Sequence, residues 1–171
     1  MKKINNIDFF ITDTVLLAQN LIGKWIVTNI GGKKVMAQII ETEAYLGVND
    51  SACHSFKGRR TNRVEPMYKM GGTIYIYLCY GLHYLFNIVS KNENEPEAVL
   101  IRAVSGAIGP SKTTKLLNID KTLNGQSIIG NSQIYLLDDG KKYNFTKDKR
   151  VGIDYAQEKD KNALLRFILK E

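Results

Sequence analysis

The chain has 171 residues, a length that fits one domain spanning residues 1–171 and suffices to bury a core without disulfides or metals. No apolar run reaches the roughly 20 residues that cross a bilayer, and Cys53 and Cys79 form neither a disulfide framework nor a zinc motif. The net charge of +7 and the pI of about 9.3 favour a polyanionic partner such as DNA or RNA.

The N-terminal third predicts a short helix followed by a hairpin. The TDT of residues 12–14, followed by VLLAQNLIG, predicts a capped helix that ends at Gly23. Residues 24–30 and 33–45 are rich in β-branched and aliphatic side chains and predict two strands joined by Gly31-Gly32.

The second of these strands ends in an unusual acidic sequence, IIETEAY. Side chains alternate between the faces of a strand, so Glu41, Glu43 and Tyr45 are expected on one face. Acids that follow aliphatic residues are explained most easily as the lining of a cleft, although surface acids on an edge strand are the plain alternative.

Residues 46–72 predict a long irregular segment with one short helical turn around residues 61–68. The segment holds His54, one of two histidines in the chain, and a basic cluster of Lys57, Arg59, Arg60 and Arg63. Loops of this length in compact domains are usually functional or disordered, so a solvated basic loop is the alternative to a binding loop.

The remainder predicts short strands and one further helix. Strands are expected at residues 73–79, 82–90, 98–104, 133–137, 150–154 and 164–169, a helix at 110–119 and a short helical turn at 120–125. Lys112 lies near the start of the first of these helices, where free backbone N–H groups suit a phosphate. Hairpin spacing predominates, which predicts an α+β fold: a single domain with a curved, mostly antiparallel β-sheet and a few short helices.

Five tyrosines, which suit stacking against nucleobases, lie within 40 residues: Tyr45, Tyr75, Tyr77, Tyr80 and Tyr84. Tyr80 precedes Gly81 at the expected hairpin tip and would project outward as a wedge between bases. Together with a water-activating acid and a basic surround, this set fits an enzyme that flips a base out of duplex DNA.

The sequence is also compatible with two other classes of protein. A non-catalytic nucleic-acid-binding domain with a tyrosine stacking platform would explain the charge and the aromatics, but not Glu43 with Arg102. A metal-dependent hydrolase would use Glu41, Glu43, Asp50 and His54, whose spacing matches no standard zinc or iron pattern.

Three blocks of the sequence resemble the alkyladenine (3-methyladenine, or methylpurine) DNA glycosylase family. They are ETEAYLGVNDSACHSFKGRRTNR at 41–63, GGTIYIYLCYGLHYLFNIVS at 71–90 and AVLIRAV at 98–104. The similarity continues more weakly through GPSK at 109–112 and RVGI at 150–153, and residues 91–97 and 120–148 differ from the family pattern.

The resemblance implies a role for each matching residue. Glu43 would be the general base that activates water, with Arg102 holding the water and the carboxylate. The flipped purine would lie between Tyr45, His54 and Tyr77, the backbone at His54 would read its edge, and Asn87 would disfavour the amino group of guanine. Tyr80 would fill the gap in the duplex, and we expect Arg59, Arg60, Arg63 and Lys112 to contact the DNA backbone.

The expected activity is base-excision repair by a monofunctional DNA glycosylase. It would hydrolyse the N-glycosidic bond of alkylated or deaminated purines of the 3-methyladenine, 7-methylguanine, hypoxanthine and ethenoadenine class. We expect a monomer without metal or cofactor whose partner is damaged double-stranded DNA and which has no membrane partner. It would work in the bacterial cytoplasm at the nucleoid, or in the nucleus of a eukaryote.

Overall fold

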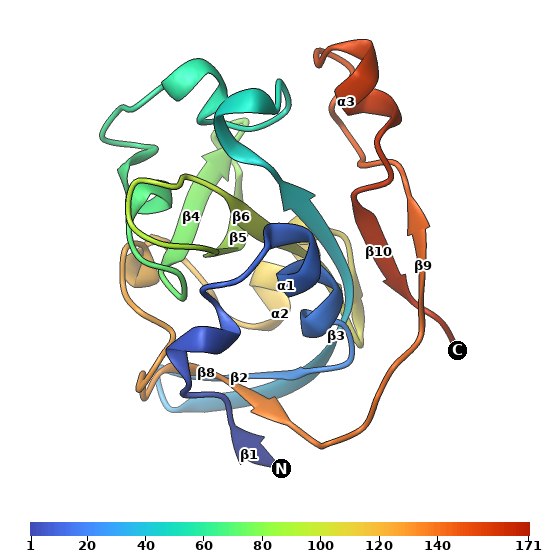
Figure 1. Ribbon diagram of the computed structural model, residues 1–171. Helices are drawn as coiled ribbons and strands as arrows, with labels where there is room; N and C mark the ends of the chain where they lie inside the picture. Colours follow the sequence, from blue (N-terminus) through green and yellow to red (C-terminus); the bar gives the residue numbers. More distant parts are fainter.

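A computed structural model describes residues 1–171 and shows an α+β domain with a curled antiparallel sheet (Figure 1). Its strands are β1 (Lys2–Lys3), β2 (Trp25–Ile30), β3 (Lys33–Tyr45), β4 (Ile74–Cys79), β5 (His83–Val89), β6 (Ala98–Val104), β7 (Ala107–Ile108), β8 (Ile134–Asp138), β9 (Phe145–Asp148) and β10 (Arg166–Leu169). Its α-helices are α1 (Thr14–Leu21), α2 (Pro110–Leu116) and α3 (Glu158–Asn162). None of these helices is long and apolar enough to cross a membrane.

The long strand β3 is the centre of the sheet, whose strand order is β1-β8-β2-β3-β6-β5-β4. The first half of β3 pairs with β2, and its second half pairs with β6 on one side and β10 on the other. Register shifts on either side of Glu41 mark a β-bulge against β6. Backbone pairing on both sides therefore holds the end of β3 that carries the two glutamates.

The main core lies between the sheet and the helices. Leu17 and Leu21 of α1, Phe86 of β5, Ile101 of β6 and Phe167 of β10 are fully buried within one apolar cluster. The N-cap carboxylate of Asp13 accepts the Leu16 N–H at 3.0 Å, which fixes where α1 begins.

Two segments far apart in sequence cover the same end of the sheet. The loop between β3 and β4 contains short 3₁₀ turns at Gly47–Asn49, Phe56–Gly58 and Glu65–Tyr68. The segment that carries α3 lies beside this loop (Figure 1), and Asp160 accepts hydrogen bonds from the backbone N–H and the hydroxyl of Ser51. These two segments bring distant residues to one site.

Most predicted elements are confirmed, including α1, the β2–β3 hairpin with its Gly31-Gly32 turn, the β4–β5 hairpin, β6, α2, β8 and β10. The predicted strand at residues 150–154 is wrong. Gly152 has a φ of 74° and the segment is a turn, with Arg150 buried in an ion pair. Strand β9 and helix α3 were not predicted, because most of their residues are polar and exposed. Pairing with β10 orders β9, and the contact of Asp160 with Ser51 holds α3 against the loop.

Candidate active site

A cavity of about 310 Å³ opens at the covered end of the sheet, which is the size range of small-molecule pockets. Its walls come from the end of β3, the loop at 52–67, both strands of the β4–β5 hairpin, β6 and the turn at 151–155. Every residue expected to catalyse or to hold the base lines this cavity: Glu43, Tyr45, His54, Tyr77, Asn87 and Arg102.

Glu43 is the buried acid of the cavity. Its side chain is 0% exposed, and its Oε2 accepts the backbone N–H of Val151 at 2.8 Å. Its Oε1 lies 3.5 Å from Nη1 of Arg102 and has no hydrogen-bond partner. Burial raises the pKa of the carboxyl group, while the Val151 N–H and the nearby arginines act to lower it. One carboxylate oxygen thus accepts a hydrogen bond, while the other is ion-paired with Arg102 and accepts no hydrogen bond.

Glu41 has a different environment, although it lies on the same strand. Its Oε1 accepts Nε of Arg102 at 3.2 Å and Nη1 of Arg166 at 2.9 Å. Glu41 therefore helps to orient Arg102 toward Glu43, and its Oε1 is shared by two arginines.

Three aromatic rings form one wall. Nδ1 of His54 lies 2.7 Å from the Tyr75 hydroxyl, and the His54 ring meets the Tyr77 ring edge-on with centroids 4.5 Å apart. Burial, together with Arg63 and Arg59, lowers the pKa of His54 to about 4. The imidazole is consequently neutral near pH 7.

Tyr45 and Asn87 complete the lining. The ring centroid of Tyr45 is 4.9 Å from the guanidinium carbon of Arg150, a cation–π distance. Asn87 is 4% exposed, and its side-chain amide donates to the Tyr75 carbonyl at 3.1 Å. This bond holds the orientation of the Asn87 side chain at the cavity surface.

Tyr80 lies at the mouth of the cavity on the tip of the β4–β5 hairpin. It is 92% exposed, has a φ of 52°, and is followed by Gly81 with a φ of 67°. The left-handed backbone closes the tight turn and leaves the ring in solvent. Its neighbour Leu82 is also 75% exposed, so the tip carries two projecting apolar side chains.

The four cationic side chains that are expected to contact DNA differ in how many contacts they make within the protein. Arg63 lines the mouth, donates to the Leu78 carbonyl at 3.0 Å and lies over the Tyr77 ring. Arg60 is tied to Glu65 by two hydrogen bonds and stacks on a tyrosine ring. Arg59 and Lys112 are exposed, and neither side chain makes a hydrogen bond or ion pair within the protein; Lys112 lies apart, on α2.

The sequence alone did not identify the contribution of the turn at 150–155. Val151 binds Glu43 through its backbone, and Tyr155 lines the cavity while its hydroxyl donates to the Ala52 carbonyl at 3.0 Å. A backbone N–H carries no signature in sequence, and the weak RVGI similarity was the only signal. Tyr75 was predicted as one of five tyrosines suited to stacking against nucleobases, but its hydrogen bond with His54 was not predicted.

The structure offers no set of metal ligands for the metal-dependent alternative. No three or more His, Cys, Asp or Glu side chains are grouped so as to hold a metal ion. Asp50 is instead paired with Arg150, and Nδ1 of His54 is bonded to Tyr75. The donor set of the cavity therefore does not fit a metal centre.

Comparison with known proteins gives a consistent result over most of the chain. The sequence profile of the family described as methylpurine-DNA glycosylase (MPG) matches residues 8–108 and 105–171. A protein of Borrelia garinii subsp. bavariensis, provisionally named a 3-methyladenine DNA glycosylase, is 45% identical over 95% of this chain and 94% of its own length. Proteins with the same provisional name from Natranaerobius thermophilus and Clostridium perfringens (strain 13 / Type A) are 42% and 36% identical, each over 96% of this chain and 94% of their own length.

Proposed function

The chain belongs to the methylpurine-DNA glycosylase family, and from this premise we propose that it is a monofunctional DNA glycosylase of base-excision repair. It flips an alkylated or deaminated purine out of duplex DNA into the cavity. There it hydrolyses the N-glycosidic bond and leaves an abasic site.

The free oxygen of Glu43 is the observation that carries this proposal. A carboxylate buried in a cavity, with one oxygen fixed by Val151 and the other unpartnered beside Arg102, is suited to hold and deprotonate a water molecule. A stacking platform that only binds nucleic acid would gain nothing from a buried acid, since an anion near the site would repel phosphates.

The bond changes follow from this arrangement. The C1′–N9 bond breaks and its electron pair leaves with the purine, while positive charge builds up on the sugar. The ionised Glu43 stabilises that charge and takes a proton from the water, whose oxygen bonds to C1′. An alkylated purine is already cationic, so it leaves as a neutral base without an added proton.

The walls of the cavity favour this substrate class. Tyr45, Tyr77 and the neutral His54 present aromatic surfaces to a flat, electron-poor ring. Tyr80 at the mouth can enter the space that the flipped base leaves. No lysine lines the cavity, so no amine is available for a Schiff base, which is the basis for proposing a monofunctional enzyme.

The substitution Glu43→Gln tests the mechanism. Because glutamine keeps the shape of the side chain but cannot accept the proton, excision from a duplex containing 7-methylguanine is expected to fall about 10²- to 10⁴-fold. Binding to a duplex with an abasic-site analogue should stay within about threefold, since the cavity and the wedge are intact. Glu158→Gln, an exposed acid on α3, is the matched control.

Undiminished excision by Glu43→Gln would refute the assignment of the base. Each reaction is run with and without EDTA. Loss of wild-type activity in EDTA would favour a metal-dependent reaction instead.

A further inference from the structure

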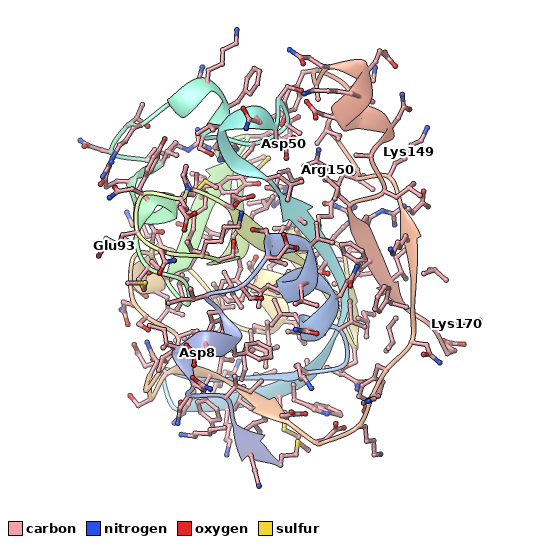
Figure 2. The ribbon with its side chains drawn as sticks, in the orientation of Figure 1. Asp8, Asp50, Glu93, Lys149, Arg150 and Lys170 are labelled. Atoms are coloured by element: carbon pink, nitrogen blue, oxygen red, sulfur yellow. The ribbon has the colours of Figure 1, made fainter.

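Asp50 and Arg150 form a buried ion pair directly behind the candidate active site. Figure 2 shows Asp50 in the loop after β3 and Arg150 next to it in the C-terminal segment. The two guanidinium–carboxylate contacts measure 2.6 and 2.9 Å, and the two side chains are 3% and 0% exposed. This is a bidentate pair that joins residues 100 positions apart.

Each partner also holds backbone on its own side of the cavity. Asp50 accepts the N–H groups of Leu46 and Ala52 at 2.9 and 3.1 Å, which shapes the loop leading to the base-pocket histidine. Arg150 donates to the Ala44 carbonyl at 3.1 Å, between Glu43 and Tyr45 in the chain. The pair therefore ties the end of β3, the following loop and the C-terminal turn together.

The residue after Arg150 makes the contact that matters for chemistry. Val151 donates its N–H to Oε2 of Glu43 at 2.8 Å, and the Arg150 guanidinium lies 4.9 Å from the Tyr45 ring. Moving Arg150 would move this N–H and would release the back of the Tyr45 ring. The N–H that binds the reacting acid thus belongs to the peptide unit that directly follows Arg150.

Stability alone does not explain an ion pair at this position. Desolvating two charges offsets their attraction, so well-packed apolar residues often serve a fold equally well. Nε of Arg150 is also buried without a partner, which is unfavourable. What the planar, five-donor guanidinium supplies here is fixed geometry across three separate segments.

We propose that Asp50 and Arg150 are positioning residues for base excision, which hold the Val151 N–H on Glu43 and the Tyr45 ring against the substrate base. This inference rests on the proposed function. The pair joins the loop to the C-terminal segment. In addition, it helps to set the rate of base excision and the ionisation of Glu43.

Two variants test the proposal. The double variant Asp50→Asn with Arg150→Gln replaces the charges by two amides that can still hydrogen-bond, so that it does not leave one charge buried alone. Arg150→Lys keeps the positive charge but loses the planar fork. Single-turnover excision of 7-methylguanine is measured from pH 5 to 9, because this cationic base needs no acid and Glu43 alone sets the acid limb.

The groups that face Glu43 are Arg102 of β6, Arg150, Arg166 of β10 and the tyrosines Tyr45, Tyr77 and Tyr155. The variants leave all of these in place except Arg150.

Displacing the Val151 N–H removes a hydrogen bond to the charged form of Glu43, so the pKa of Glu43 should rise. Both variants are expected to shift the acid limb upward by about one pH unit. At pH 7 the rate should fall by about 10- to 100-fold, with partial recovery at higher pH.

The control removes an ion pair remote from the cavity, between Lys24, which directly precedes β2, and Asp138 at the end of β8, through Lys24→Met with Asp138→Asn. It should leave rate and pH profile unchanged. Rates are divided by the active fraction, titrated with an abasic-site duplex.

Three results would overturn the proposal. One is an unchanged rate and pH profile per active molecule, because a purely structural pair would lower only the active fraction. Another is an acid limb that shifts in the double variant but not in Arg150→Lys. That result would show that the charge of Arg150, and not the position it fixes, sets the pKa of Glu43. The third is a wild-type protein that excises no base, which refutes the proposed function itself and is seen before any variant is compared.

Discussion

The neutral histidine of the site makes folding stability depend on pH in a defined window. His54 has a pKa lowered from 6.5 to about 4 in the folded protein, because burial and the neighbouring Arg63 and Arg59 disfavour its charged form. The unfolded chain therefore binds a proton at a pH where the folded chain does not. Stability should fall as the pH drops from 6.5 toward 4 and should level off below that as far as His54 is concerned.

The size of the effect follows from the two pKa values. A shift from 6.5 to about 4 means that between pH 7 and 4.5 the contribution of His54 to the free energy of unfolding falls by about 2 kcal/mol. Glu43 acts in the opposite direction, since its raised pKa makes the folded state the better proton acceptor. The effect of His54 must accordingly be measured as a difference between two proteins.

The variant for that difference is His54→Gln, which cannot be protonated in this range. Urea unfolding followed by circular dichroism at pH 7.0 and 4.5 gives the free energy of unfolding for both proteins. The wild type should lose about 2 kcal/mol more than the variant between these pH values. Equal losses would refute the argument that the pocket holds His54 neutral.

Two further predictions concern DNA binding. Tyr80→Ala should weaken binding to lesion-containing duplex by about 1–3 kcal/mol in fluorescence anisotropy, with an unchanged melting temperature, because the ring is 92% exposed; an unchanged affinity would remove the wedge. Arg59→Ala should reduce the slope of log K against log[salt] by about 0.9, whereas Arg60→Ala should change it less, because Arg60 is already paired with Glu65. Equal slopes for the two variants would show that the intramolecular pairing does not matter.

The sequence predicted the elements whose side-chain pattern is local. Asp13 caps α1, Gly31-Gly32 closes the first hairpin, and the strand at 98–104 is found with its predicted bounds. The sequence also predicted which residues are brought together at the cavity, because the long motifs at 41–63 and 71–90 contain most of them.

The segment at 150–154 shows why other features of the fold and of the site could not be predicted from the sequence. Arg150, Val151 and Ile153 have the composition of a strand, but the arginine is drawn out of any ladder by Asp50, a partner 100 residues earlier. The contact of Val151 with Glu43 is made by backbone, which every residue possesses. Neither interaction has a local sequence pattern, so only the folded chain reveals them.

The structure also separates the two glutamates that the strand pattern placed on one face. Oε1 of Glu41 accepts hydrogen bonds from Arg102 and Arg166, while Oε1 of Glu43 is ion-paired with Arg102 and accepts no hydrogen bond. On the opposite face, Thr42 donates its hydroxyl to the Ala18 carbonyl of α1 and locks the strand between helix and cavity.

Glu43 itself is paired through its backbone register with Leu100 of β6 and Arg166 of β10. A free carboxylate oxygen on a strand that cannot shift is preorganised for charge developing beside it. The acid with an unused acceptor oxygen is therefore the one suited to act on a water molecule, while Glu41, whose Oε1 binds two arginines, helps to aim Arg102.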